Sequence, residues 1–116
     1  MGLRLREDLD ATFITLAGDG WRGVATFAEA QGVEFLCPKC YQENAGKVGT
    51  HMVICWSRSR GVPDDVSPGP GRWKMDGTGL ENLTLNGEEP NGARSVLLTS
   101  GCGWHGFVTD GIAGDA

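Results

Sequence analysis

The sequence predicts a small, mainly β domain built from short antiparallel strands, with at most one short helix. Three observations support this class. The chain has 116 residues, which is the length of one domain, so residues 1–116 are taken as a single unit. It contains 19 glycines, well above the roughly 7% of an average protein, which favours turns over long helices. Short runs of β-branched and aromatic residues recur between glycine-rich turns.

The first half of the chain contains three predicted elements and a connection. Residues 11–16 are rich in β-branched and aromatic residues and end at a Gly-Asp-Gly turn, which predicts a strand. Residues 21–30 have an apolar spacing compatible with a short helix, although part of this segment also suits an extended chain. Residues 33–36 alternate and run directly into Cys37 as a strand, and residues 41–49 are polar enough to be a loop or hairpin connection.

The middle of the chain combines the clearest strand with the longest irregular segment. Residues 50–56 form the strand, in which His51 and Cys55 share one face. Residues 57–71 follow with three Pro, three Gly and no hydrophobic period. We therefore expect a long irregular loop at 57–71 that is exposed and among the least ordered parts of the molecule.

The last part of the chain is expected to contain shorter strands. They are predicted at residues 72–75, 80–85, 95–99 and 107–109, with turns between them. The final residues, 114–116, are expected to fray.

The sequence contains two pairs of residues that are typical soft metal ligands. Cys37 and Cys40 have the C-x2-C spacing, and Cys102 and His105 have the matching C-x2-H spacing. Such spacings let a tight turn aim two side chains at one ion, and zinc prefers four thiolate or imidazole ligands. A strand is predicted to enter and leave each pair. The sequence therefore predicts a zinc-ribbon-like fold whose two metal knuckles hold one structural zinc ion.

Other uses of the four cysteines remain open. In an exported chain they would form two disulfides. However, the charged residues after Met1 do not resemble a signal peptide. No run of residues is apolar enough to span a membrane. A cytoplasmic location is therefore expected. A redox-active C-x-x-C would require a parallel α/β pattern around it, which the sequence does not show.

Several segments together resemble a known family. They are FLCPKC at residues 35–40, Arg72-Trp73, the LTL at 83–85, and above all CGWHGFVTDG at 102–111. In these anchors, spread over residues 33–112, the chain resembles a zinc-binding family of bacteriophages and bacteria known as domain of unknown function 6527. The resemblance implies Cys37, Cys40, Cys102 and His105 as ligands and a phage or prophage accessory role, and it implies no activity. For a phage-encoded protein the expected location is the cytoplasm of the host cell.

Two further groups of residues near the predicted site were considered. His51 and Cys55 are possible ligands, but a buried free thiol and a hydrogen-bonded histidine that supports a ligand fit their strand positions better. Glu34 and Glu43 flank the first ligand pair, where a zinc hydrolase would place a general base, but neither lies in a recognised catalytic spacing. No catalytic residue is assigned.

The basic residues around the long loop suggest a possible partner surface. Arg58, Arg60 and Trp73 lie near its ends, where guanidinium groups and an aromatic ring would suit a nucleic acid. However, Asp64 and Asp65 lie in the same loop, and the formal net charge is −5. A non-enzymatic module that binds a protein partner is therefore the expected function. Nucleic-acid binding is the first alternative and zinc-dependent hydrolysis the second.

Overall fold

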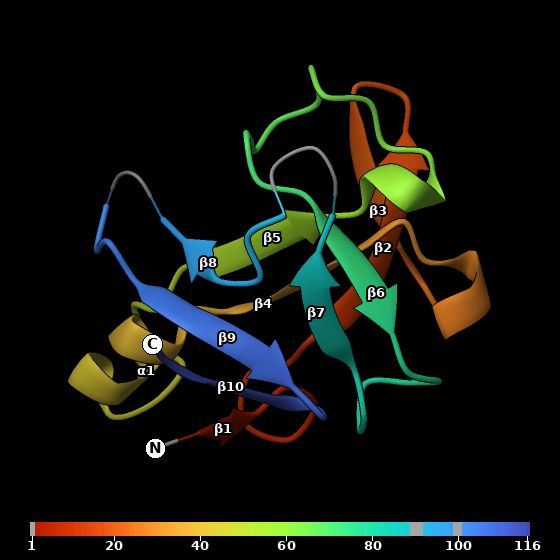
Figure 1. Ribbon diagram of the computed structural model, residues 1–116. Coiled ribbons are helices and arrows are strands. Elements are labelled where there is room, and N and C mark those ends of the chain that lie inside the picture. The colour runs from red at the N-terminus through yellow and green to blue at the C-terminus, as the bar shows by residue number, and fades with distance from the viewer. Residues whose placement is uncertain (1, 89–91, 99–100) are drawn as a thin grey trace.

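The computed structural model describes residues 2–88, 92–98 and 101–116, and short strands dominate it (Figure 1). The strands are β1 (Leu3–Arg4), β2 (Thr12–Ala17), β3 (Gly20–Val24), β4 (Gly32–Leu36), β5 (Met52–Trp56), β6 (Trp73–Asp76), β7 (Thr84–Gly87), β8 (Val96–Leu97), β9 (His105–Thr109) and β10 (Ile112–Asp115). The helical elements are the α-helix α1 (Pro38–Asn44) and two 3-10 turns, η1 (Phe27–Glu29) and η2 (Arg58–Arg60).

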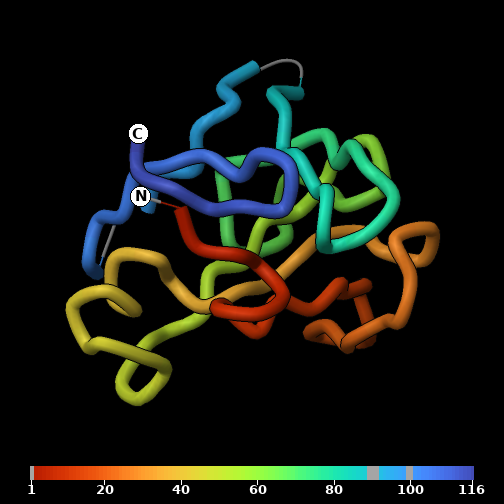
Figure 2. Tube along the Cα trace, turned by 90° about the horizontal axis from the view of Figure 1, so that it is seen from below, coloured from red at the N-terminus to blue at the C-terminus, as the bar shows by residue number. Residues whose placement is uncertain are grey.

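The strands pair in antiparallel fashion in three sheets. The first sheet has the order β1-β10-β9-β8, the second β3-β2-β4-β5, and the third is the pair β6-β7. Figure 2 shows the C-terminal hairpin of β9 and β10 (blue) in a different layer from β2 and β4 (red and orange). Buried side chains from all three sheets, among them Phe35, Val108 and Leu85, form one apolar cluster. The core therefore holds an N-terminal layer against a C-terminal layer.

The predicted fold class is confirmed: the described chain is mainly β and antiparallel, with a single short α-helix. Its helix lies elsewhere than predicted. The segment 21–30 is largely β3 and η1, because residues 20–24 pair with β2 along their whole length. The predicted fraying of residues 114–116 is also wrong in part, since β10 runs to Asp115, and Gly114 and Asp115 pair with Phe107 and Gly106 of β9.

The α-helix begins inside the first ligand pair. Cys37 is its N-cap residue, and Pro38 occupies the first helical position, where its fixed φ suits a helix and its missing N–H is not needed. Ala45 ends the helix in a left-handed conformation, with its N–H donating to the carbonyl of Gln42. Part of the segment predicted as a loop, residues 41–49, is therefore helical.

The segment 57–71 is more closely held than its composition predicts. Many of its residues are exposed, but Ser57 and Val62 are buried, and Val62 packs with Ile14 and Trp56 in a second apolar cluster. η2 also lies within the segment. Two buried charged side chains, Glu88 and Arg72, hold this loop through backbone groups.

Arg72 anchors the second half of the loop from inside. Its side chain is buried, and its two terminal nitrogens donate to four carbonyl oxygens, those of Pro63, Val66, Pro68 and Gly71, at 2.7–3.0 Å. Burial lowers the pKa of the Arg72 guanidinium from its ordinary value. The guanidinium thus replaces the regular backbone pairing that residues 63–71 lack.

We expect Arg72→Ala to destabilise the domain by at least about 2 kcal/mol, because it removes the hydrogen bonds to all four carbonyl oxygens and a hydrogen bond from a charged group contributes about 1.5–3 kcal/mol. Urea unfolding of the two proteins measures this difference. Arg22→Ala, which removes an exposed arginine from β3, is the matched control and should be nearly neutral. An equal, small effect of both substitutions would contradict the anchoring role.

Glu88 holds the beginning of the loop. Only 8% of this residue is exposed, and its carboxylate accepts hydrogen bonds from the N–H groups of Arg58 and Ser59, both at 2.8 Å, and from Ser57 Oγ at 3.3 Å. Burial by itself raises the pKa of Glu88, but the hydrogen bonds from Ser59, Arg58 and Ser57 outweigh burial and lower this pKa below its ordinary value.

The carboxylate of Glu88 should make stability depend on pH. Because its pKa is lower in the folded chain, its contribution is complete above the unfolded-state pKa and is lost as pH falls through the folded-state pKa. We expect Glu88→Gln to lower the free energy of unfolding by roughly 1–3 kcal/mol at neutral pH. This difference in stability between the variant and the wild type should become smaller as the pH falls. Urea unfolding across a pH series measures this difference, with the exposed Glu43→Gln as control. A stability difference that does not change with pH would show that the Glu88 carboxylate does not hold the loop.

Candidate metal centre

Four soft donors meet where the two layers join. Cys37 directly follows β4, Cys40 lies in the first turn of α1, His51 directly precedes β5, and Cys102 lies between β8 and β9. One ligand atom from each side chain lies within 4.8 Å of all the others. Three donors thus come from the β4-α1-β5 segment and one from the C-terminal layer. Cys102 is therefore the donor that connects the layers.

The register of the β4-β5 hairpin places His51 opposite Cys37. Leu36 pairs with Met52, and one residue further on the N–H of Cys37 donates to the carbonyl of His51 at 2.8 Å. The side chain of His51 then turns its Nε2 toward Cys102 Sγ at 3.4 Å. On the other side of the ring, Nδ1 lies 3.2 Å from the carbonyl oxygen of Met52. A proton on Nδ1 donated to this carbonyl leaves the Nε2 lone pair facing the sulfurs.

Backbone donors face the sulfurs in both ligand turns. The backbone N–H groups of Cys40 and Lys39 act to lower the pKa of Cys37, and that of Trp104 acts to lower the pKa of Cys102. Gly101 and Gly103, on either side of Cys102, have φ values of 67° and 70°, which favour glycine. Such N–H donors stabilise negative charge on sulfur, so both turns have the features of a metal knuckle.

The geometry of the four atoms suits a zinc ion. Cys37 Sγ and Cys102 Sγ are 3.4 Å apart, as are His51 Nε2 and Cys102 Sγ. Ligands on a tetrahedron with zinc bond lengths are separated by about 3.5–3.8 Å. Three thiols and one imidazole are also the donor set of a structural zinc site. The residues present therefore fit zinc in their donor chemistry and in these two separations.

Proton affinities differ among the three thiols. Burial raises the pKa of the Cys37 thiol to about 12, and burial also raises that of Cys40. Burial acts in the same direction on Cys102, but its contacts with His51, with the Trp104 N–H and with the other two thiols outweigh burial and lower the pKa of Cys102 to about 7. Burial thus favours the neutral thiol at Cys37 and Cys40, and a bound divalent cation would supply the counter-charge that lets all three sulfurs ionise as ligands.

The structure does not bring His105 into this group. His105 opens β9, where it pairs with Leu97 and is exposed, whereas the neighbouring Trp104 is buried. Trp104 packs edge-to-face on Phe35 with ring centroids 6.0 Å apart, and its Nε1 donates to Asp115 Oδ1 at 3.1 Å. Because successive residues of an extended chain point in opposite directions, burying Trp104 turns His105 outward. His51 therefore takes the place in the group that the spacing assigned to His105.

One residue not singled out in the sequence supports the site. Lys39, between the first two cysteines, donates from Nζ to the carbonyl oxygen of Cys102 at 2.7 Å. This contact ties the turn that carries Cys102 to the start of α1. Cys55, by contrast, is buried on β5 outside the group, and burial raises the pKa of its thiol. Its place in the apolar core agrees with a packing role.

The residues of the proposed partner surface make internal contacts. Arg60 donates to the carbonyls of Phe27 and Ala30 and lies over the Phe27 ring. Arg58 Nε donates to Asp64 Oδ1 at 2.7 Å. Trp73 is buried and its Nε1 donates to the Ser95 carbonyl. These contacts place Arg58, Arg60 and Trp73 away from the metal group and within the framework of the loop.

No family model, curated protein or solved structure matches this chain. None of the helices in the described part of the chain has the length and apolar character that crossing a bilayer requires.

Proposed function

We propose that the chain is a non-enzymatic binding module, held together by one structural zinc ion and directed at a protein partner. The observation that carries this proposal is the group of Cys37, Cys40, His51 and Cys102, which fills a four-ligand shell and joins the two layers of the fold. A domain of this size has a small core, so a metal cross-link between its layers adds materially to its stability.

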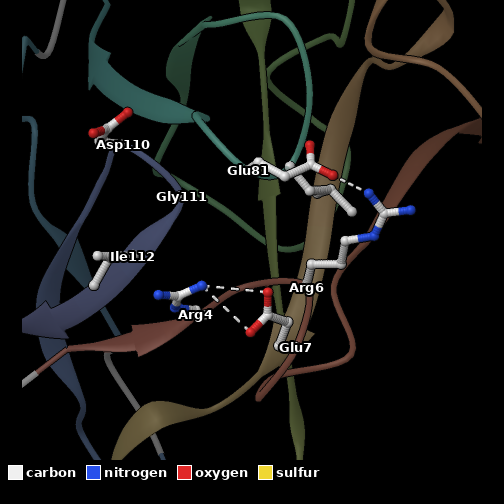
Figure 3. A pocket seen from close by; sticks show the side chains of 8 residues that line it. Arg4, Arg6, Glu7, Glu81, Asp110, Gly111 and Ile112 are labelled. Carbon is white, nitrogen blue, oxygen red and sulfur yellow. Dashed lines mark hydrogen bonds and ion pairs between the residues drawn. The ribbon is translucent and has the colours of Figure 1, made fainter.

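A coordination shell made of four protein ligands favours a structural zinc ion over a catalytic one. Three thiolates and an imidazole occupy all four positions of a tetrahedral site and leave none for an activated water. The two glutamates next to the first ligand pair are outside the group: Glu34 accepts from Trp21 Nε1 at 3.3 Å, and Glu43 is exposed on α1. A hollow of about 250 Å³ (Figure 3) lies instead beside the ion pairs Arg4–Glu7 and Arg6–Glu81, and no member of the metal group lines it.

Charge and exposure favour a protein over a nucleic acid. Phosphate binding needs clustered free cations, whereas the formal net charge is −5 and both Arg60 and Arg72 are bound to carbonyl groups. Trp56 and Trp73, which would stack on bases, are buried. Among the exposed large apolar side chains are Trp21 and Met52, residue types that are enriched in protein interfaces.

Metal analysis and a binding titration test this proposal together. The purified protein should contain about one zinc per chain. Its affinity for labelled single- and double-stranded oligonucleotides should stay weak in about 50 mM salt, where a phosphate-binding protein binds most tightly. A folded protein without metal would overturn the structural role of zinc. Binding that weakens steeply between about 50 and 200 mM salt would move the nucleic-acid alternative to first place.

A hydrolase assay tests the second alternative. We expect no hydrolysis of chromogenic ester or phosphate substrates that is lost with a chelator and restored by zinc. Activity that follows zinc in this way would show that one of the four side chains is not a ligand.

A further inference from the structure

The sulfur atoms of Cys37 and Cys102 are already in contact. They lie 3.4 Å apart, although the two residues are 65 positions apart in the chain and belong to different layers. Building on the zinc site proposed above, we propose that these two cysteines form a peroxide-sensitive pair. Oxidation of Cys102 and its capture by Cys37 would join the layers through a disulfide and remove two of the four zinc ligands.

The surroundings of the two sulfurs assign them different roles. Cys102 is half-buried and lies between two exposed glycines, so a small oxidant can reach its sulfur. Cys37 is fully buried behind it at the end of β4. Cys102 is therefore the residue that meets the oxidant, and Cys37 is the residue that resolves the product.

The backbone around Cys102 allows the sulfurs to approach each other. A disulfide has an S–S distance of about 2.05 Å, so the present contact must shorten by about 1.4 Å. Gly101 and Gly103 carry no side chains that would resist this movement, and the backbone of Cys37 is fixed by its hydrogen bond to His51. Residues 101–103 would move, and the end of β4 would stay in place.

The reaction balances with a hydroperoxide as the oxidant. The Cys102 sulfur attacks a peroxide oxygen; an S–O bond forms, the O–O bond breaks, and hydroxide or alkoxide leaves. The Cys37 sulfur then attacks the Cys102 sulfur; the S–S bond forms, the S–O bond breaks, and the departing hydroxide takes up a proton to become water. The two sulfurs together lose two electrons, which reduce the peroxide.

The product would differ from a chain that loses its metal to a chelator. Only Cys40 and His51 would remain as ligands, too few for a structural zinc site. The new disulfide, however, would connect the same two layers that the metal had connected. Oxidation would thus exchange a metal cross-link for a covalent one.

Treatment of the zinc-loaded protein with stoichiometric hydrogen peroxide tests the proposal. Zinc release is followed with a chromogenic chelator, and the disulfide is located by proteolysis and mass spectrometry without reduction. We expect about one zinc released per disulfide, a Cys37–Cys102 linked peptide, and full reversal by a thiol reductant with added zinc. Cys55→Ser, which removes the cysteine outside the group, should react in the same way as the wild type.

Two results would overturn the proposal: retention of zinc at stoichiometric peroxide, or a main disulfide that joins Cys40 to Cys37 or to Cys102. The mapping uses the wild-type chain, so it does not depend on whether a cysteine variant folds. It can also be carried out on reduced, metal-free protein. A chain that binds no zinc but still forms the Cys37–Cys102 bond would refute the proposed function and leave the pairing intact.

Discussion

Replacement of Cys40 by serine is expected to remove zinc from the protein and to unfold it. Zinc binding in small structural sites contributes about 10–16 kcal/mol, which is comparable to the whole stability of a typical domain, about 5–15 kcal/mol. A serine hydroxyl is a poor zinc ligand, so the variant keeps only three good donors. The readouts are the zinc content of the purified protein and its circular dichroism on heating.

Cys55→Ser is the matched control, since it makes the same chemical change at a thiol outside the metal group. Cys55 is buried, with only 1% exposed, so an unpaired hydroxyl there should cost roughly 1–3 kcal/mol without loss of metal. The ratio of zinc to protein therefore separates the two variants even if both are less stable. Equal loss of zinc from both would show that the ligand assignment is wrong.

The strands were predictable because their side chains alternate or are β-branched. The sequence located β2, β4 and β5 to within two residues, and the turns at Cys37 and Cys102 followed from ligand spacing. α1 was missed because the polar stretch after Cys40 resembles a loop. The residues that start this helix are its N-cap Cys37 and Pro38 in the first helical position.

The fourth donor could not be obtained from ligand spacing alone. His51 reaches the group because it lies across the hairpin from Cys37, and this register depends on where α1 ends and β5 begins. A signal against His105 was present in the sequence, since the adjacent Trp104 is large and apolar, and such side chains are highly buried on average. The contacts of Arg72 and Glu88 were not predictable, because their partners are mostly backbone groups, some of them distant in the chain.

His51→Ala is expected to weaken zinc binding strongly, whereas His105→Ala should leave it unchanged. Loss of a residue that merely supports a ligand lowers metal affinity by about 10- to 100-fold, and loss of a ligand itself should cost more than this. Competition with a chelator of known zinc affinity measures the difference for both variants. Thermal unfolding in excess zinc then shows whether either variant still folds when metal is supplied.

The two histidines make a well-matched pair for this test. Both are exposed, and both lie at the start of a strand, so alanine at either position should disturb packing little. They differ in that His51 Nε2 faces Cys102 Sγ at 3.4 Å, while His105 is turned away by the burial of Trp104. A larger loss of zinc affinity in His105→Ala would restore the ligand set expected from the C-x2-H spacing. It would also mean that the turn after Cys102 closes on the metal in a different conformation, with Trp104 displaced from Phe35.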